Sequence, residues 1–161
     1  MTPQPCNSGL PDAPLKRPES VLVVIHTPDY LVLLLERCAP TGFWQSVTGS
    51  LEPGEAPADT AIREVREETG IILPPASLRD WRHSQRFEIP PEWRGRYPPG
   101  TSHNLEHVFS ACVPDARPVL LSPSEHRAFR WLPAPQAARE VASWTNRDAI
   151  LTLFSEAPRN G

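Results

Sequence analysis

The stretch Gly49–Ile71, GSLEPGEAPADTAIREVREETGI, contains the residues that decide the fold. Its middle part has apolar residues at helical spacing, which predicts an amphipathic helix with one buried stripe. That stripe is expected to contain Ala58, Ala61, Ile62 and Val65. Proline suits a first helical turn and glycine suits the position just past a helix end. The pattern therefore predicts a helix over Pro57–Thr69, ended by Gly70.

Three glutamates gather on one side of this helix, at Glu64, Glu67 and Glu68. Like charges three or four residues apart repel, at a cost of about 0.2–0.5 kcal/mol per pair. A divalent cation would offset that repulsion, and Mg²⁺ prefers hard oxygen ligands such as carboxylates and phosphates. The alternative interpretation is a solvated charged face of an amphipathic helix. The residues around the glutamates decide between the two.

Outside this stretch, runs of apolar and β-branched residues predict strands, and helical spacing returns near the carboxyl end. The expected strands are Ser20–His26, Tyr30–Glu36, Ser77–Ile89, Leu105–Val113 and Arg127–Leu132. The expected helices are Ala134–Ser143 and Thr145–Ser155, the second with Thr145 as a candidate N-cap. Strands interspersed with helices predict an α/β fold, a mixed sheet with helices packed on it.

Length and composition exclude several classes of protein. A chain of 161 residues with 39% hydrophobic and 22% charged residues fits one globular domain, expected over residues 15–157. Residues 1–14 are rich in proline and are expected to be a flexible extension. A net charge of −3 argues against a broad nucleic-acid surface. No apolar run approaches the roughly 20 residues of a membrane helix. The amino terminus lacks a secretory pattern, so we expect a cytoplasmic protein.

The spacing of the fixed residues in Gly49–Ile71 matches the Nudix signature, Gly-x5-Glu-x7-Arg-Glu-apolar-x-Glu-Glu-x-Gly-apolar, at every position. The chain therefore resembles Nudix hydrolases. The resemblance implies an α/β/α sandwich in which this stretch forms a loop-helix-loop, and hydrolysis of a diphosphate linkage with Mg²⁺, or alternatively Mn²⁺, as cofactor. It implies metal ligands among Glu64, Glu67 and Glu68, and an Arg63 that holds Glu55 or a neighbouring carboxylate. The catalytic candidates are Arg63, Glu64 and Glu67. The general base is either Glu67 or a carboxylate outside the helix.

A wider resemblance spans roughly Lys16 to Ile150, and FWQSVTGS and SWTNRDAI are its most discriminating pieces. These pieces look like the Nudix enzymes that act on 7,8-dihydroneopterin 3′-triphosphate in folate synthesis, leaving the monophosphate and pyrophosphate. The resemblance implies that Glu125 joins Glu64 and Glu68 as a metal ligand. The residues that it implies for substrate binding are Lys16, Arg37, Thr48, Phe87, Glu88, Ile89, Pro90 and Ser143.

Each of these assignments has a plainer alternative. Glu125 alone reads as a surface glutamate, Phe87 as a core residue and Ser143 as a helix cap. The segment Pro90–Gly100 suits either a lid or a packing loop. For the whole protein, the alternatives are a pyrophosphohydrolase of dATP or another purine nucleoside triphosphate, and a nucleotide-binding domain without turnover. We expect a small-molecule triphosphate as partner, no nucleic acid, no membrane, and a monomer or homodimer.

Overall fold

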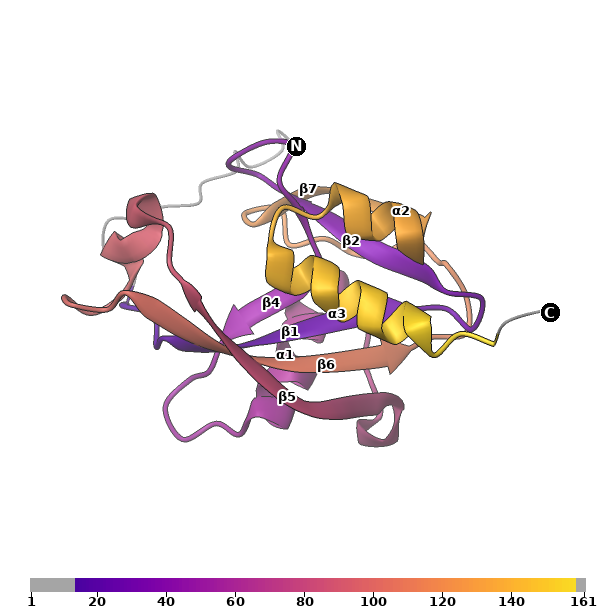
Figure 1. Ribbon diagram of the computed structural model, residues 1–161, viewed down its shortest axis with the longest axis horizontal. Helices are drawn as coiled ribbons and strands as arrows, with labels where there is room; N and C mark the ends of the chain where they lie inside the picture. The colour runs from indigo at the N-terminus through magenta and orange to yellow at the C-terminus, as the bar shows by residue number, and fades with distance from the viewer. Residues whose placement is uncertain (1–13, 159–161) are drawn as a thin grey trace.

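The computed structural model describes residues 14–158, so the expected extension over residues 1–14 lies outside it except for Pro14. A seven-stranded mixed sheet forms the centre of the molecule (Figure 1). Its strands are β1 (Glu19–His26), β2 (Leu31–Arg37), β3 (Trp44–Gln45), β4 (Val47–Ser50), β5 (Leu78–Glu88), β6 (His103–Cys112) and β7 (His126–Pro133). The main order is β3-β2-β1-β6-β5, with β4 paired to β1 and β7 paired to β2. Strands β1 and β6 are parallel, and the other pairs are antiparallel.

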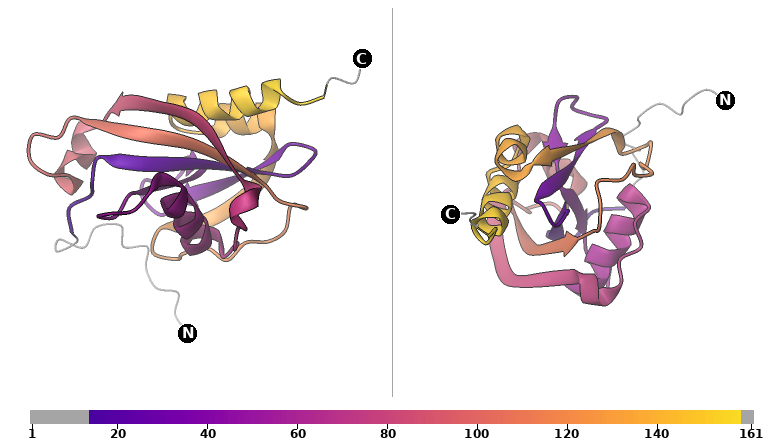
Figure 2. Two further views of the ribbon diagram at one scale, coloured as in Figure 1. Left: turned by 90° about the horizontal axis from the view of Figure 1, so that it is seen from below. Right: turned by 90° about the vertical axis from the view of Figure 1, so that its right-hand side faces the viewer.

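Helices cover the sheet on opposite sides (Figure 2). Helix α1 (Pro57–Thr69) lies on one side, and α2 (Ala134–Glu140) and α3 (Trp144–Ser155) lie on the other. Short 3-10 turns, η1 (Pro75–Ser77) and η2 (Pro91–Arg96), precede and follow β5. The expected α/β/α sandwich is confirmed. Among residues 14–158, no helix is long and apolar enough to cross a membrane.

Alternating side chains divide the core between the two sides of the sheet. In β1, Val21 and Val23 pack in the cluster that contains Ala61 and Val65 of α1. Val24 packs instead with the cluster that contains residues of α2 and α3. Because both faces of the central strands are covered, these strands read as continuous apolar runs in the sequence.

Helix α1 has the predicted bounds, but one residue of its predicted stripe is exposed. Ala61 and Val65 are fully buried, whereas Ala58 is exposed and Ile62 is only half-buried. At about 100° per residue, Ala58 and Ile62 both fall on the same margin of a face centred on Ala61 and Val65. The opposite margin is buried and contains Glu64. The helix is therefore rotated to bury carboxylates on one side of the apolar stripe.

The start of α3 also differs from the prediction. Ser143 is the N-cap, because its Oγ accepts a hydrogen bond from the backbone N of Asn146 at 3.1 Å. The prediction of Thr145 as cap is wrong, since Thr145 already lies inside the helix. Helix α2 ends at Glu140, so the predicted helix over Ala134–Ser143 is too long by its last turn.

Candidate active site

Glu64 and Glu68 of α1 form a buried carboxylate pair. Glu68 is 2% exposed and Glu64 is 9% exposed. The two carboxyl groups lie close enough for each to affect the pKa of the other. Burial, and then the charge of Glu64, raises the pKa of Glu68 well above its usual value. Burial also raises the pKa of Glu64, although the charge of Arg63 opposes this. The fold thus buries two acidic groups in surroundings that raise the pKa of each of them.

A glycine of β4 makes room for this pair. A Cβ atom added to Gly49 would lie 2.1 Å from Cδ of Glu64 and 2.4 Å from its Cγ. No side chain fits there while Glu64 keeps its position. The first fixed glycine of the signature therefore positions a carboxylate of the helix that follows it.

Arg63 connects the loop before α1 to the carboxylates of the helix. Its Nε donates to Oε2 of Glu55 at 2.8 Å and its Nη2 donates to Oε1 of Glu55 at 2.8 Å. Nη1 donates to Oε1 of Glu64 at 2.8 Å and, more weakly, to Glu67 at 3.3 Å. Hydrogen bonds from Arg63 lower the pKa of Glu55 to about 2, and Thr60 adds another bond. Arg63 thereby fixes Glu64 through a network that keeps Glu55 ionised.

The other two predicted carboxylates lie at the margin of the pair. The Glu67 side chain is 47% exposed and pairs with Arg63. Glu125 is exposed and lies close enough to Glu68 to raise its pKa. The neighbouring His126 is buried, with its Nε2 3.6 Å from Oε1 of Glu68. Burial lowers the pKa of His126 to about 4, so its ring is neutral at pH 7 and adds no charge beside the pair.

The pair has the features that a divalent cation requires. Oε2 of Glu68 is buried and has no hydrogen-bond partner among residues 14–158, although such atoms are usually satisfied. The donor set consists of carboxylate oxygens, which suit Mg²⁺. Among residues 14–158, no three acidic, histidine or cysteine side chains already form a cluster around one point. Mg²⁺ is commonly held by one or two carboxylates with water and phosphate completing its shell, so the pair fits it.

Cationic side chains from distant segments lie beside the carboxylates. Lys16 precedes β1, and Arg37 ends β2. Desolvation, and then the charge of Arg96 of η2, lowers the pKa of both Lys16 and Arg37. Glu125 acts on both groups in the opposite direction. Among the described residues, none of these three cations has a carboxylate within ion-pair distance. The arrangement is suited to an anion with several charges.

The remaining residues predicted to bind substrate lie in different environments. Thr48 and Phe87 are half-buried on strands β4 and β5, and Pro90 is half-buried just after β5. Glu88 is paired with Arg94, Ile89 is 1% exposed, and Ser143 is the cap of α3. The side chain of Phe87 is therefore more accessible to a ligand than the side chain of Ile89. No contact of the described residues tests the roles predicted for this group.

Two buried polar residues beside Phe87 were not predicted. Asn104 of β6 is the cross-strand partner of Phe87, and Glu106 is the partner of Gln85, so these side chains share one face of the sheet. Asn104 is 2% exposed and its Oδ1 has no partner. Glu106 is 5% exposed and accepts a hydrogen bond from Gln85 at 3.2 Å. No local pattern in β6 identifies them, because their position beside Phe87 and Gln85 follows from the register between β5 and β6.

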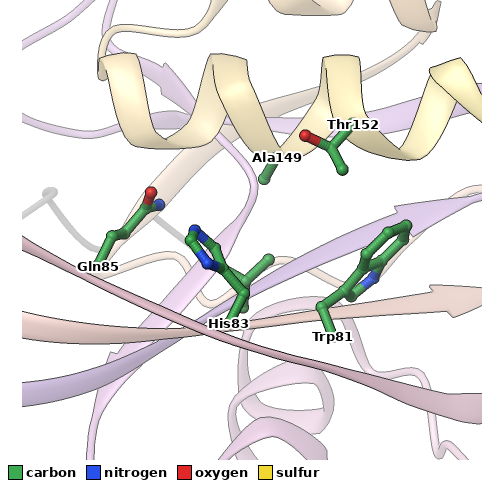
Figure 3. A pocket seen from close by; sticks show the side chains of 6 residues that line it. Trp81, His83, Gln85, Ala149 and Thr152 are labelled. Carbon is green, nitrogen blue, oxygen red and sulfur yellow. The ribbon is translucent and has the colours of Figure 1, made fainter.

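A pocket between β5 and α3 is a poor candidate for a phosphate site (Figure 3). It has a volume of about 60 Å³. It is lined by Trp81, His83, Gln85, Val108, Ala149 and Thr152. Because this lining has no carboxylate, lysine or arginine, it suits neither a metal ion nor a triphosphate.

The comparisons with known proteins agree with this geometry. A model of the NUDIX domain matches residues 16–153. The chain belongs to the Nudix family.

Several of its curated relatives carry one name. It is 44% identical over 142 residues to dihydroneopterin triphosphate diphosphatase of Escherichia coli, covering 86% of this chain and 93% of that protein. The protein of the same name from Haemophilus influenzae is 43% identical, covering 84% and 86% of the two chains. The solved structure of the E. coli dihydroneopterin triphosphate pyrophosphohydrolase matches with a TM-score of 0.82 and 41% identity, covering 90% of this chain and 98% of that one.

Proposed function

We propose that this protein hydrolyses 7,8-dihydroneopterin 3′-triphosphate to dihydroneopterin monophosphate and pyrophosphate, with Mg²⁺ as cofactor. The observation that carries the proposal is the position of the Glu64–Glu68 pair beside cations that form no ion pair within residues 14–158. A buried acidic pair with a free oxygen suits a divalent cation, and the cations suit phosphate oxygens. The names of relatives 43–44% identical over most of the chain support the choice of substrate.

Glu64 and Glu68 would hold the Mg²⁺, with Glu125 close enough to take part. Mg²⁺ supplies neutralisation of phosphate charge and activation of bound water. Arg63 keeps Glu64 in place, and Lys16 and Arg37 hold and orient the phosphate chain. Water adds across the bond between the α and β phosphates, and pyrophosphate leaves. Glu67 is the most exposed of the three signature glutamates on the helix, so it is a candidate to accept the proton.

The ring end of the substrate would lie on the face that Phe87 shares with Asn104. Phe87 is half-buried and offers a stacking surface to a flat heterocycle. The unpartnered Oδ1 of Asn104 is an acceptor for a ring N–H or amino group, which a pterin has in abundance.

A cytoplasmic location is also part of this proposal.

Product analysis with dihydroneopterin triphosphate and Mg²⁺, run beside dATP, tests the proposal. We expect equimolar pyrophosphate and dihydroneopterin monophosphate, with a kcat/KM well above that for dATP. A higher kcat/KM for dATP would contradict the pterin substrate while leaving the hydrolase chemistry intact. Release of inorganic phosphate alone would contradict cleavage between the α and β phosphates. No product with either substrate would favour a nucleotide-binding domain without turnover.

A further inference from the structure

Two arginines on the η2 turn have opposite surroundings. Arg94 is neutralised, because its Nη2 lies 2.8 Å from Oε1 of Glu88 and its Nε donates to the carbonyl of Ile89 at 2.9 Å. Arg96 has no ion pair and donates no side-chain hydrogen bond within the part of the chain that the structure describes. The Arg94 guanidinium therefore already has partners within the protein, whereas the Arg96 guanidinium is available to a ligand.

Contacts with the rest of the site fix the position of Arg96. The ring of Trp93 lies 5.0 Å from the guanidinium carbon of Arg37 and 5.5 Å from that of Arg96. The same ring packs against Phe43, with ring centroids 5.4 Å apart. The backbone N of Lys16 donates to the carbonyl oxygen of Arg96 at 2.7 Å. The turn is thus attached both to the end of β2 and to the segment before β1.

This attachment brings three cations together, and among residues 14–158 none of them has a carboxylate within ion-pair distance, although Glu125 partly offsets the repulsion at Lys16 and Arg37. Arg96 lowers the pKa of Lys16 and of Arg37, in each case after desolvation as the larger cause. Like charges that are partly desolvated and close together oppose one another, so the arrangement is unfavourable unless an anion binds. A chain of phosphates carries several charges and can contact all three side chains at once.

We propose that Arg96 is a substrate-binding residue and the third cation, with Lys16 and Arg37, that holds the phosphate chain. This inference rests on the proposed triphosphate substrate and adds a residue to its site. The guanidinium group can donate two parallel hydrogen bonds to phosphate oxygens, which a lysine at the same place cannot do. Trp93 acts as a positioning residue, because the guanidinium groups of both Arg37 and Arg96 lie over its ring.

The test compares Arg96→Ala with Arg94→Ala, a matched change on the same turn. Binding of inorganic pyrophosphate in the presence of Mg²⁺ is measured by calorimetry, together with KM and kcat for dihydroneopterin triphosphate. We expect Arg96→Ala to weaken pyrophosphate binding and raise KM by roughly tenfold or more, the scale of a lost charge-assisted contact. Arg96→Lys should recover part of that loss. Arg94→Ala should bind pyrophosphate within about twofold of the unmodified protein, since it loses no phosphate contact.

Thermal unfolding separates binding from folding in this experiment. A loss of pyrophosphate affinity at an unchanged midpoint of unfolding is the expected result for Arg96→Ala. Unchanged affinity and KM in Arg96→Ala would overturn the inference. Equal losses in Arg94→Ala and Arg96→Ala would also overturn it, because they would assign both arginines to the shape of the turn. If the unmodified protein bound pyrophosphate but did not hydrolyse the pterin triphosphate, the proposed function would fail while Arg96 kept its role.

Discussion

Glu55 and Glu68 are glutamates of the same signature, yet the structure places them in opposite conditions. Glu55 receives two hydrogen bonds from Arg63 and one from the Thr60 hydroxyl, and its pKa is lowered to about 2. Glu68 is fully buried, has a free oxygen and faces Glu64, and its pKa is raised. The first carboxylate is stable in the fold as an anion, and the second is not.

The difference teaches which glutamates of the loop-helix-loop support structure and which are available for chemistry. Arg63 connects the two kinds of glutamate, because one side of its guanidinium group binds Glu55 and the other side binds Glu64, the neighbour of Glu68 in the buried pair. We call Glu55, with its donors Arg63 and Thr60, the satisfied half of the site, and the buried pair Glu64 and Glu68 the unsatisfied half. The satisfied half therefore holds the unsatisfied half in position. Buried polar groups without partners cost stability, so a fold that keeps them has another use for them.

The largest effect is expected from Glu68→Gln, which removes an acidic group from the unsatisfied half. We predict that kcat falls by roughly a hundredfold or more, the scale of losing one electrostatic contact to a reacting group. Stability without Mg²⁺ should be equal to or higher than that of the unmodified protein, because a desolvated, repelled acid is removed. Kinetics and thermal unfolding check this, with the exposed Glu140→Gln as control. Wild-type turnover in Glu68→Gln would remove the distinction between the two halves.

Gly49→Ala should disturb the unsatisfied half alone, by moving Glu64. The new Cβ would overlap the Glu64 side chain, so the carboxyl group must shift. A misplacement of about 1 Å at a reacting group can cost up to a hundredfold in rate, and we expect a loss of roughly tenfold to a hundredfold. Gly95→Ala is the matched control, since an added Cβ there meets no atom within 4 Å. Full activity in Gly49→Ala would show that the position of Glu64 does not matter.

Glu55→Gln should act on the satisfied half and mainly on stability. The hydrogen bonds from Arg63 favour the ionised form of Glu55. We therefore expect the substitution to lower the free energy of unfolding at pH 7 by about 1–2 kcal/mol, a figure that allows for screening by solvent around Glu55. A pKa lowered in the folded state stabilises it above the usual value of 4.5, and this contribution is lost as the pH falls toward about 2. Urea unfolding at pH 7 and pH 3 should therefore show a larger difference between the two proteins at pH 7. A difference that grows at pH 3 would contradict the assignment.

Ser143→Ala gives the smallest expected effect and lies outside both halves. Loss of the N-cap of α3 should lower stability by about 1 kcal/mol, measured by chemical unfolding. If Ser143 is only a cap, KM for the substrate should stay within about twofold, whereas a raised KM at unchanged stability would favour the predicted substrate contact. Thr152→Ala, farther along the same helix, is the control.

The sequence was sufficient for the elements with strong local signals. Helix α1 has the predicted bounds because proline and glycine mark its ends. The long strands differ from prediction by a residue or two at their ends. The short strands β3 and β4 were not predicted, because Trp44–Gln45 and Val47–Ser50 are defined by pairing with β2 and β1 and have little pattern of their own.

Residue identities were easier to predict than their environments. The signature identified Glu55, Glu64 and Glu68, but not which of them is satisfied, since that depends on the rotation of α1 and on the backbone of Gly49. For a related reason Asn104 was not predicted as a site residue, and Arg96 was predicted only as part of the segment Pro90–Gly100, which suits either a lid or a packing loop. The importance of Asn104 follows from the register between β5 and β6. The importance of Arg96 follows from its closeness to Lys16 and Arg37, which are more than 50 residues away from it in the chain, so no short stretch of sequence contains the signal.

Calorimetric titration of Mg²⁺ into the unmodified protein, Glu55→Gln and Glu68→Gln at pH 7 tests the central claim most directly. The account predicts that the unmodified protein and Glu55→Gln both bind Mg²⁺ and release protons on binding, and that Glu68→Gln binds far more weakly. Equal Mg²⁺ affinity in Glu68→Gln and the unmodified protein would contradict the assignment of the buried pair as the metal site.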